Sequence, residues 1–194
     1  MCCLPWGSIV VSTANKTGLV AVLAALFVSN GVSAQSHSMH DGPVMNYHRI
    51  DERLVTGGHL VDDGLATLKA QGVQVVIDLR DDPPSGQKER LAREGIEWIN
   101  IPVVWGDPKA ADFERFSETM REHQDDHVLV QCAANYRASA MTYLYRVTVE
   151  NVPEDEAAAD LRAVWNPDET ETWRDYIDNI KASAPWPARP QAIK

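Results

Sequence analysis

The chain has 194 residues, of which 28 are acidic and 18 are basic, and its formal net charge at pH 7 is −10. An acidic chain of this kind lacks the positive surface that binds nucleic acid or anionic lipid, so we expect neither partner. A polyanionic substrate would approach against a repulsive field. The charge therefore favours a small anionic substrate over a large one.

The N-terminus carries the pattern of a secretory signal peptide. Lys16 precedes an apolar core over 18–28, and small residues at Val32 and Ala34 follow it. The core is shorter than the roughly 20 apolar residues that a membrane span needs, which disfavours the alternative of a membrane anchor. We predict cleavage after Ala34 and a periplasmic or secreted protein without stable membrane association.

The remaining chain is long enough for one domain with a substantial core. We predict a signal peptide over 1–34, a flexible leader over 35–46, one folded domain over 47–181 and a flexible tail over 182–194. Cys132 is then the one cysteine of the mature chain, which excludes an intramolecular disulfide. We find no metal-ligand spacing and expect no cofactor.

Apolar patterns alternate along the domain between short runs typical of strands and longer runs with helical spacing. The run over 73–79 is nearly continuous and β-branched, as in a central strand buried on both faces, and Asp78 within it is interpreted as structural. We expect Asp168 to cap the last helix. The predicted strands are 47–50, 54–56, 73–79, 96–101 and 128–130, and the predicted helices are 61–71, 87–93, 110–123, 137–147, 153–165 and 168–180.

This alternation predicts an α/β fold, in which a mainly parallel central sheet is flanked by helices in a single-domain sandwich. In such sheets, binding sites form at the carboxyl ends of the strands. The stretch from Val128 to Val147 combines a buried strand, a tight loop and a helix. It places Cys132 at the end of the strand and Arg137 at the start of the helix.

That arrangement has a chemical consequence. Backbone N–H groups at a helix N-terminus are unpaired and favour negative charge, so they favour the reactive thiolate of a nearby cysteine. Arg137 adds a planar cation suited to an oxyanion. The alternative is a buried cysteine at a strand end, with Arg137 merely solvated.

The stretch resembles the active-site loop of the cysteine-dependent phosphatases of the tyrosine and dual-specificity type, whose pattern is His-Cys, five residues, Arg, then Ser or Thr. Here Gln131 replaces the histidine, and four residues separate Cys132 from Arg137. Asn135 takes the place of the family's glycine, and asparagine tolerates a left-handed backbone. An ungapped overlay puts Ala138 on the family's arginine and Ser139 on its Ser/Thr. The order of strands and helices over 47–150 is similar as well.

The resemblance implies that Cys132 attacks phosphorus, that Arg137 holds the phosphoryl oxygens and that Ser139 helps the thiolate to leave. The loop then binds the substrate through Ala133, Ala134, Asn135, Tyr136, Ala138 and Ser139. The family's general acid follows the preceding strand, but Val103 and Val104 occupy that place. Asp107 is the nearest carboxylate and our candidate acid; the alternative for it is a helix cap or turn. Trp105 beside it is either a pocket wall or core.

Two other functions stay open. The four-residue spacing also resembles the sulfurtransferase loop of rhodanese, and it resembles a phosphatase-like domain found alone or beside β-lactamase-fold hydrolases, some members of which are linked to sulfur transfer. Cys132 would then carry a persulfide and pass sulfur to a thiol-bearing acceptor or to cyanide. A catalytically inactive module that binds anions or proteins is the third possibility. The phosphatase is favoured, because its resemblance covers about a hundred residues.

Overall fold

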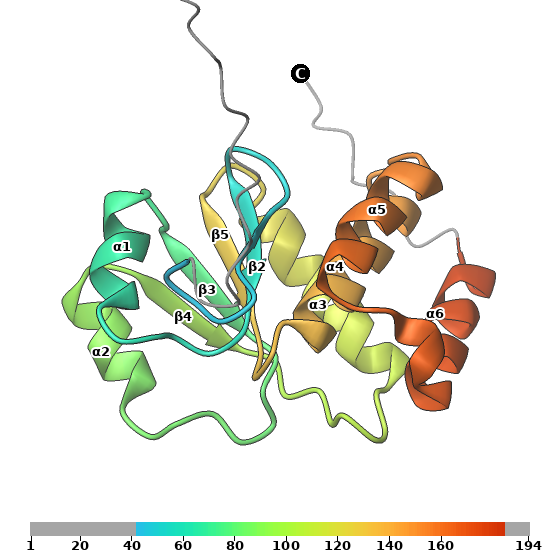
Figure 1. The fold of residues 1–194 in the computed structure, drawn as a ribbon, viewed down its shortest axis with the longest axis horizontal. Helices are drawn as coiled ribbons and strands as arrows, with labels where there is room; N and C mark the ends of the chain where they lie inside the picture. The colour runs from blue at the N-terminus through green and yellow to red at the C-terminus, as the bar shows by residue number, and fades with distance from the viewer. Residues whose placement is uncertain (1–41, 185–194) are drawn as a thin grey trace, which may run out of the picture. The chain divides into compact units, whose positions relative to one another are not determined.

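The computed structural model describes residues 42–184. The predicted signal peptide, the start of the leader and most of the predicted tail lie outside these residues. Five strands, six α-helices and one short 3-10 helix follow one another in the described part (Figure 1). They are β1 (His48–Arg49), β2 (Leu54–Gly57), α1 (Gly64–Ala70), β3 (Val75–Asp78), α2 (Gln87–Arg93), β4 (Glu97–Asn100), α3 (Ala110–Glu122), β5 (Val128–Gln131), α4 (Tyr136–Thr148), α5 (Glu154–Val164), η1 (Pro167–Glu169) and α6 (Glu171–Ala182).

The strands form one sheet in the order β1-β2-β5-β3-β4. β2, β5, β3 and β4 run parallel, and β1 joins the edge of β2 in antiparallel pairing. β5 is central, with Val128 opposite both Leu54 and Val75. The predicted α/β fold with a mainly parallel sheet is therefore confirmed.

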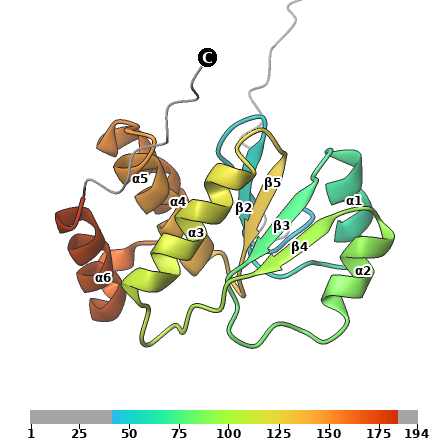
Figure 2. The same ribbon diagram turned by 180° about the vertical axis from the view of Figure 1, so that it is seen from behind.

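Helices cover both faces of the sheet. In Figures 1 and 2, α1 and α2 lie on one side, and α3 to α6 lie on the other. Two apolar clusters fill the spaces between these layers, and the larger one includes Phe113, Phe116, Leu144, Leu161 and Trp173 from the four helices of the second side. The smaller cluster includes Leu65, Leu68 and Leu91 from α1 and α2.

Alternate residues of β5 point to opposite faces, as the period of two along a strand requires. Val128 and Val130 belong to the larger cluster, and Leu129 belongs to the smaller one. Cys132 also belongs to the larger cluster. Gln131 instead has the same parity as Leu129, so Gln131 and the following Cys132 face different helical layers.

The domain begins earlier than the sequence indicated. Residues 42–46, placed by our prediction in a flexible leader, pack against the domain: Val44 is fully buried and bridges to Leu60. Two glycines at the end of β2 allow neighbouring segments to lie close to this strand. A Cβ atom at Gly57 would lie 2.1 Å from Val44 Cγ2, and one at Gly58 would lie 2.7 Å from the carbonyl oxygen of Ala133.

The predicted cap of the last helix is wrong. Asp168 lies in η1, where its backbone N–H donates to the side chain of Asn166, and α6 begins only at Glu171. Asn166 is the residue whose side chain caps this segment, and Pro167 begins the 3-10 helix after it. Across residues 42–184, no helix has both the length and the apolar character of a membrane span.

Candidate active site

Cys132 directly follows the central strand β5, and α4 begins four residues later at Tyr136. The chain leaves β3 toward α2 on one side of the sheet and leaves β5 toward α4 on the other. Adjacent parallel strands whose connections diverge in this way open a crevice beyond their carboxyl ends, where α/β proteins bind ligands. Cys132 therefore lies at the position in the sheet at which a site is expected.

Asn135 shapes the loop between Cys132 and α4. Its φ angle is 70°, in the left-handed region, so the prediction for this position is confirmed. The side chain is fully buried, and its Nδ2 donates to the carbonyl oxygen of Asn46 at 2.6 Å and to Thr56 Oγ1 at 3.0 Å. The residue thus combines a backbone conformation close to glycine's with two bonds that glycine cannot make.

The first carbonyl of the loop is turned toward the end of β2. The backbone N–H of His59 donates to the Ala133 oxygen at 3.0 Å, and His59 Nδ1 lies 3.0 Å from the same atom. Because C=O and N–H point in opposite directions across a trans peptide, the N–H of Ala134 points away from His59. The first N–H groups of α4 add further donors at its start, where the helix dipole favours an anion.

Arg137 lies in the first turn of α4 and is buried. Its Nη1 donates to Asp81 Oδ1 at 2.7 Å and to the carbonyl oxygen of Val103 at 2.6 Å. The hydrogen bond from Arg137 lowers the pKa of Asp81 below its ordinary value. The guanidinium is therefore held by the loops that follow β3 and β4, and it is not freely solvated.

Asp81 is a site residue that the sequence analysis missed. A signal was present, because Asp81 follows a predicted strand whose carboxyl end had to lie beside that of β5. We predicted no role for Asp81 from the sequence. Strand order, which the sequence does not give, was needed to connect Asp81 with Arg137.

Cys132 is buried, with 2% of its surface exposed, and it is a free thiol. The hydroxyl of Ser139 donates to the carbonyl oxygens of Asn135 and Tyr136, at 2.8 Å and 3.1 Å, and it accepts from Trp165 Nε1 at 3.1 Å. Ser139 thus secures the first turn of α4 in this state. No hydrogen bond among the described residues joins it to Cys132.

Gln131, which replaces the family's histidine, is tied to the opposite side of the sheet. Its Nε2 donates to Asp78 Oδ2 at 2.9 Å. Asp78 also accepts from Arg80, Gln87 and Trp98 and is fully buried, in agreement with its structural interpretation. A buried carboxylate with this many donors is well compensated, so the network fixes the ends of β3 and β5 relative to each other.

No hydrogen bond or ion pair within residues 42–184 joins Asp107 to Arg137. Asp107 is exposed on the turn before α3 and pairs with Lys109, while α3 itself is capped by Lys109 and Asp112. The carboxylate that we expected to act as the acid is therefore exposed to solvent. Delivery of a proton from Asp107 would require this loop to fold over the site.

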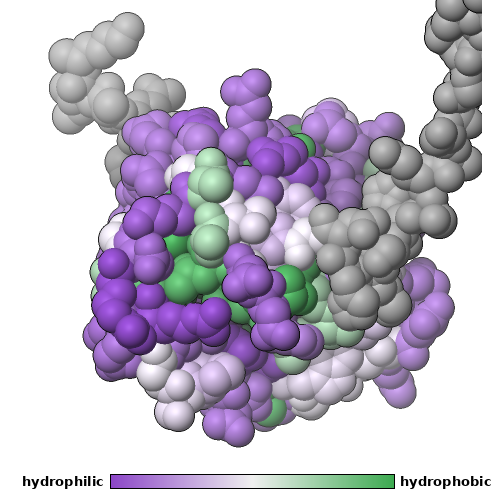
Figure 3. Space-filling model, turned by 60° about the vertical axis from the view of Figure 1, so that its left-hand side comes forward, coloured by the Kyte–Doolittle hydropathy of each residue, from purple (hydrophilic) through white to green (hydrophobic). Residues whose placement is uncertain are grey.

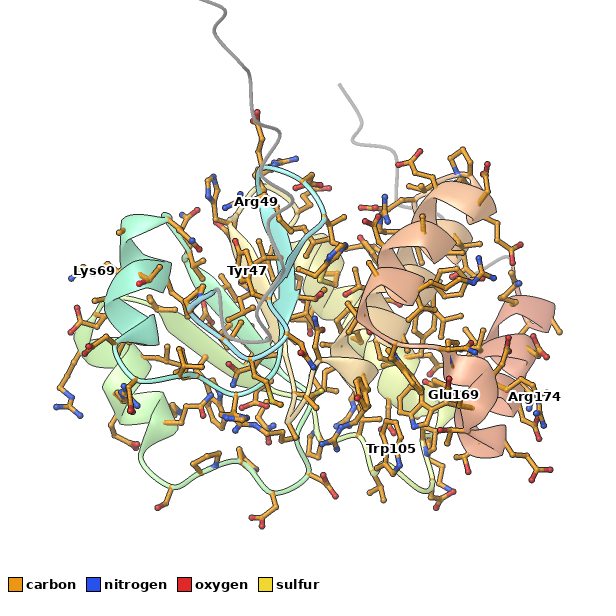
Figure 4. The ribbon with its side chains drawn as sticks, viewed as in Figure 1. Tyr47, Arg49, Lys69, Trp105, Glu169 and Arg174 are labelled. Atoms are coloured by element: carbon orange, nitrogen blue, oxygen red, sulfur yellow. The ribbon has the colours of Figure 1, made fainter. Side chains whose placement is uncertain are left out.

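Trp105 precedes that turn and belongs to an aromatic group beside the loop. Its ring centroid lies 6.2 Å from that of Tyr136, 5.6 Å from that of Trp165 and 5.2 Å from that of Trp173. Trp173 Nε1 donates to the Trp105 carbonyl oxygen, and Figure 4 shows Trp105 beside α6. Because Trp105 keeps 37% of its surface exposed, it forms a wall that is open to solvent.

No group of three or more His, Cys, Asp or Glu side chains that could hold a metal ion occurs within residues 42–184.

Comparison with known proteins agrees with this geometry. Residues 30–179 match the family model described as DSP-PTPase phosphatase fused to NAD+ kinase. Among solved structures, a DUF442 protein from Shewanella putrefaciens CN-32, named as a candidate phosphatase, is 30% identical with a TM-score of 0.64. The alignment covers 72% of this chain and 93% of that one. No curated protein matches the sequence.

More distant structures share the fold. PTPMT1 is 20% identical with a TM-score of 0.55, and the alignment covers 70% of this chain and 96% of that one. TpbA from P. aeruginosa is 15% identical with a TM-score of 0.59, and the alignment covers 71% and 87% of the two chains. At these identities the likeness concerns the fold alone.

Proposed function

Because the chain belongs to the cysteine-dependent phosphatase family of the tyrosine and dual-specificity type, we propose that it hydrolyses phosphomonoesters with Cys132 as the nucleophile. One observation carries the proposal. Cys132 directly follows the central strand, a 13-residue helix begins four residues later at Tyr136, and Arg137 lies buried in the first turn of that helix. A nucleophile, backbone donors and a cation thus meet within six residues.

The reaction has two steps. In the first, the Cys132 thiolate attacks phosphorus, the P–O bond to the leaving group breaks, and the leaving oxygen takes a proton from an acid or from water. In the second, water attacks the phosphocysteine and gives up a proton, which replaces the one used in the first step; the S–P bond breaks, inorganic phosphate leaves, and the thiolate returns. Loop N–H groups and Arg137 stabilise the charge on the phosphoryl oxygens in both transition states.

Asp81 positions Arg137 in this scheme. A lowered pKa keeps Asp81 ionised near neutral pH, and an ionised carboxylate cannot protonate a leaving group. The same charge makes it a strong acceptor for the guanidinium. We therefore assign Asp81 to holding Arg137 and not to proton transfer.

Asp107 stays the candidate acid only if its loop closes over bound substrate. Without an acid, an aryl phosphate reacts much faster than an alkyl phosphate, because a phenolate leaves more readily than an alkoxide. The ratio of the two rates in the wild-type protein and in Asp107→Asn measures this contribution directly.

Sulfur transfer is the second candidate, and the four-residue loop favours it, because a single sulfur atom needs a narrower ring of donors than a phosphoryl group. The Cys132 thiolate would attack thiosulfate and form a persulfide, releasing sulfite. Cyanide would then take the outer sulfur as thiocyanate and restore the thiolate. Neither step requires a general acid.

We also propose that the protein is exported and acts on a small anionic substrate. The support for export is the pattern of Lys16, the apolar core and the small residues before Ala34. N-terminal sequencing of the protein from its native host tests the proposal: a chain that begins at residue 35 is expected, and one that begins earlier contradicts it.

Assays of phosphate release from an aryl phosphate and of thiocyanate formation from thiosulfate and cyanide separate the two enzymatic functions. Phosphate release that requires Cys132 supports the phosphatase. Thiocyanate formation that requires Cys132, without phosphate release, would replace it by the sulfurtransferase. The absence of both would leave a binding module.

A further inference from the structure

A surface depression of about 310 Å³ lies beside the Cys132 loop, on the α2 side of the sheet. The polar side chains that line it come from His59, Arg80, Ser85, Gln87 and Arg90. Its volume is at the lower end of the range for small-molecule sites. Figure 3 brings the α1 and α2 side of the domain forward and shows hydrophilic residues around a smaller apolar patch there.

The charged side chains that line this depression are basic, whereas the chain as a whole is acidic; the charge of Arg80 is balanced by the buried Asp78, so Arg90 supplies the uncompensated charge. Two arginines line it, and none of its lining residues is acidic, although the formal charge of the whole chain is −10. Arg90 is exposed, and no carboxylate within residues 42–184 forms an ion pair with it. A local reversal of charge in a hollow concentrates small anions.

Arg80 is held in a fixed orientation. Its Nε donates to Asp78 at 2.9 Å, and its Nη2 donates to Asp78 at 2.6 Å and to Gln87. Nη1 has no hydrogen-bond partner in the described part of the chain. Because the guanidinium is already ordered, less conformational entropy is lost when it binds an oxyanion.

The depression adjoins the nucleophile loop through two contacts. His59 bonds to the carbonyl of Ala133, which follows Cys132. Asp78 accepts from both Arg80 and Gln131, which precedes Cys132. Moreover, Arg80 lines the depression while its neighbour Asp81 holds Arg137. The loop that follows β3 thus contacts both the depression and Arg137.

We propose that this depression binds a second phosphate group of the substrate, so that the preferred substrate is a small molecule with at least two phosphates. This inference rests on the proposed function, which places the reacting phosphate at Cys132. Arg80 and Arg90 hold the second phosphate, with His59 between it and the loop. A substrate with one phosphate leaves the depression unused.

Calorimetric titration of the Cys132→Ser variant tests the inference without turnover. One inorganic phosphate ion can occupy the loop or the depression but not both, whereas one tripolyphosphate ion can occupy the two positions together. We expect tripolyphosphate to bind at least about tenfold more tightly than phosphate, since a charge-assisted hydrogen bond to an added phosphate contributes on this order. Arg90→Gln should remove most of that gain.

Arg93→Gln is the matched control. Arg93 lies on the same helix as Arg90 and is also exposed, and it donates to the Glu89 carbonyl oxygen outside the depression. Its replacement by glutamine removes the same charge as Arg90→Gln does. The Arg93→Gln variant should still bind tripolyphosphate at least about tenfold more tightly than phosphate. Equal binding of the two anions, or equal losses in Arg90→Gln and Arg93→Gln, would overturn the inference.

A parallel assay of phosphate release from an aryl phosphate separates this inference from the proposed function. Release without an Arg90-dependent gain for tripolyphosphate overturns the second site and leaves the phosphatase in place. An Arg90-dependent gain without any release supports the second anion site and overturns the phosphatase.

Discussion

Arg137 Nη1 and Asp81 Oδ1 lie 2.7 Å apart and join the helix that follows β5 to the loop that follows β3. The arginine is buried and the aspartate is partly exposed, so the pair lies at the boundary between core and solvent. Together with the bond to the Val103 carbonyl oxygen, the contact holds the guanidinium at the carboxyl end of the sheet before any substrate arrives. Preorganised charge of this kind lowers a barrier without reorganisation during the reaction.

Asp81→Asn should lower kcat/KM for an aryl phosphate by about tenfold, because a neutral amide orients Arg137 less firmly than a carboxylate does. Asp82→Asn is the control, since Asp82 is exposed in the same loop and loses the same charge. It should stay within about twofold of wild type. Steady-state kinetics of both variants measure the difference, and equal losses would mean that loop charge in general is responsible.

The Arg137–Asp81 pair should also give a pH-dependent stability. The folded pKa of Asp81 lies below its ordinary value of 3.8, so the stabilisation is present above that value and disappears as the pH falls through the folded pKa. Solvent exposure of Asp81 limits it to less than about 1 kcal/mol. In urea unfolding, the free energy of unfolding should be higher for wild type than for Asp81→Asn near neutral pH, and the two values should be equal in strong acid. A constant difference would contradict the assignment.

Two substitutions of Asn135 distinguish the contribution of its hydrogen bonds to stability from the cost of its left-handed backbone. Asn135→Gly keeps the left-handed conformation and loses the bonds to Asn46 and Thr56, so unfolding free energy should fall by about 1–3 kcal/mol. Asn135→Ala loses the same bonds and also places an alanine at positive φ, so its free energy of unfolding should be roughly 1 kcal/mol lower than that of Asn135→Gly. Denaturant unfolding checks the order. An alanine variant as stable as the glycine variant would show that the loop relaxes.

Asp107→Asn should change the rate of aryl phosphate hydrolysis by no more than about twofold, because Asp107 is exposed and pairs with Lys109. The comparison is made with an alkyl phosphate in parallel. A loss of about a hundredfold or more that is larger for the alkyl ester would show loop closure and make Asp107 the general acid.

The sequence predicted the fold well because the pattern that specifies it is local. The buried runs around Val76 and Leu129 and the helical spacing of Phe113 and Phe116 are each contained within one element. Strand, loop and helix around Cys132 were predictable for the same reason. Asn135 could be assigned a left-handed backbone from residue type alone.

The parts that failed depend on contacts between distant segments. Burial of Val44 requires knowledge that Gly57 leaves room for it, and the role of Asp81 requires knowledge that β3 lies beside β5. The placement of Asp107 depends on the path of a turn. None of these relationships is encoded in the spacing of neighbouring residues.

The central claim is that Cys132 attacks phosphorus, and phosphate release from an aryl phosphate by wild type and by Cys132→Ser tests it most directly. We predict measurable release by wild type and a loss of at least about a thousandfold in Cys132→Ser, because a serine hydroxyl is not ionised at neutral pH. Circular dichroism should show the same fold for both. A Cys132→Ser variant that retains wild-type activity would contradict the account.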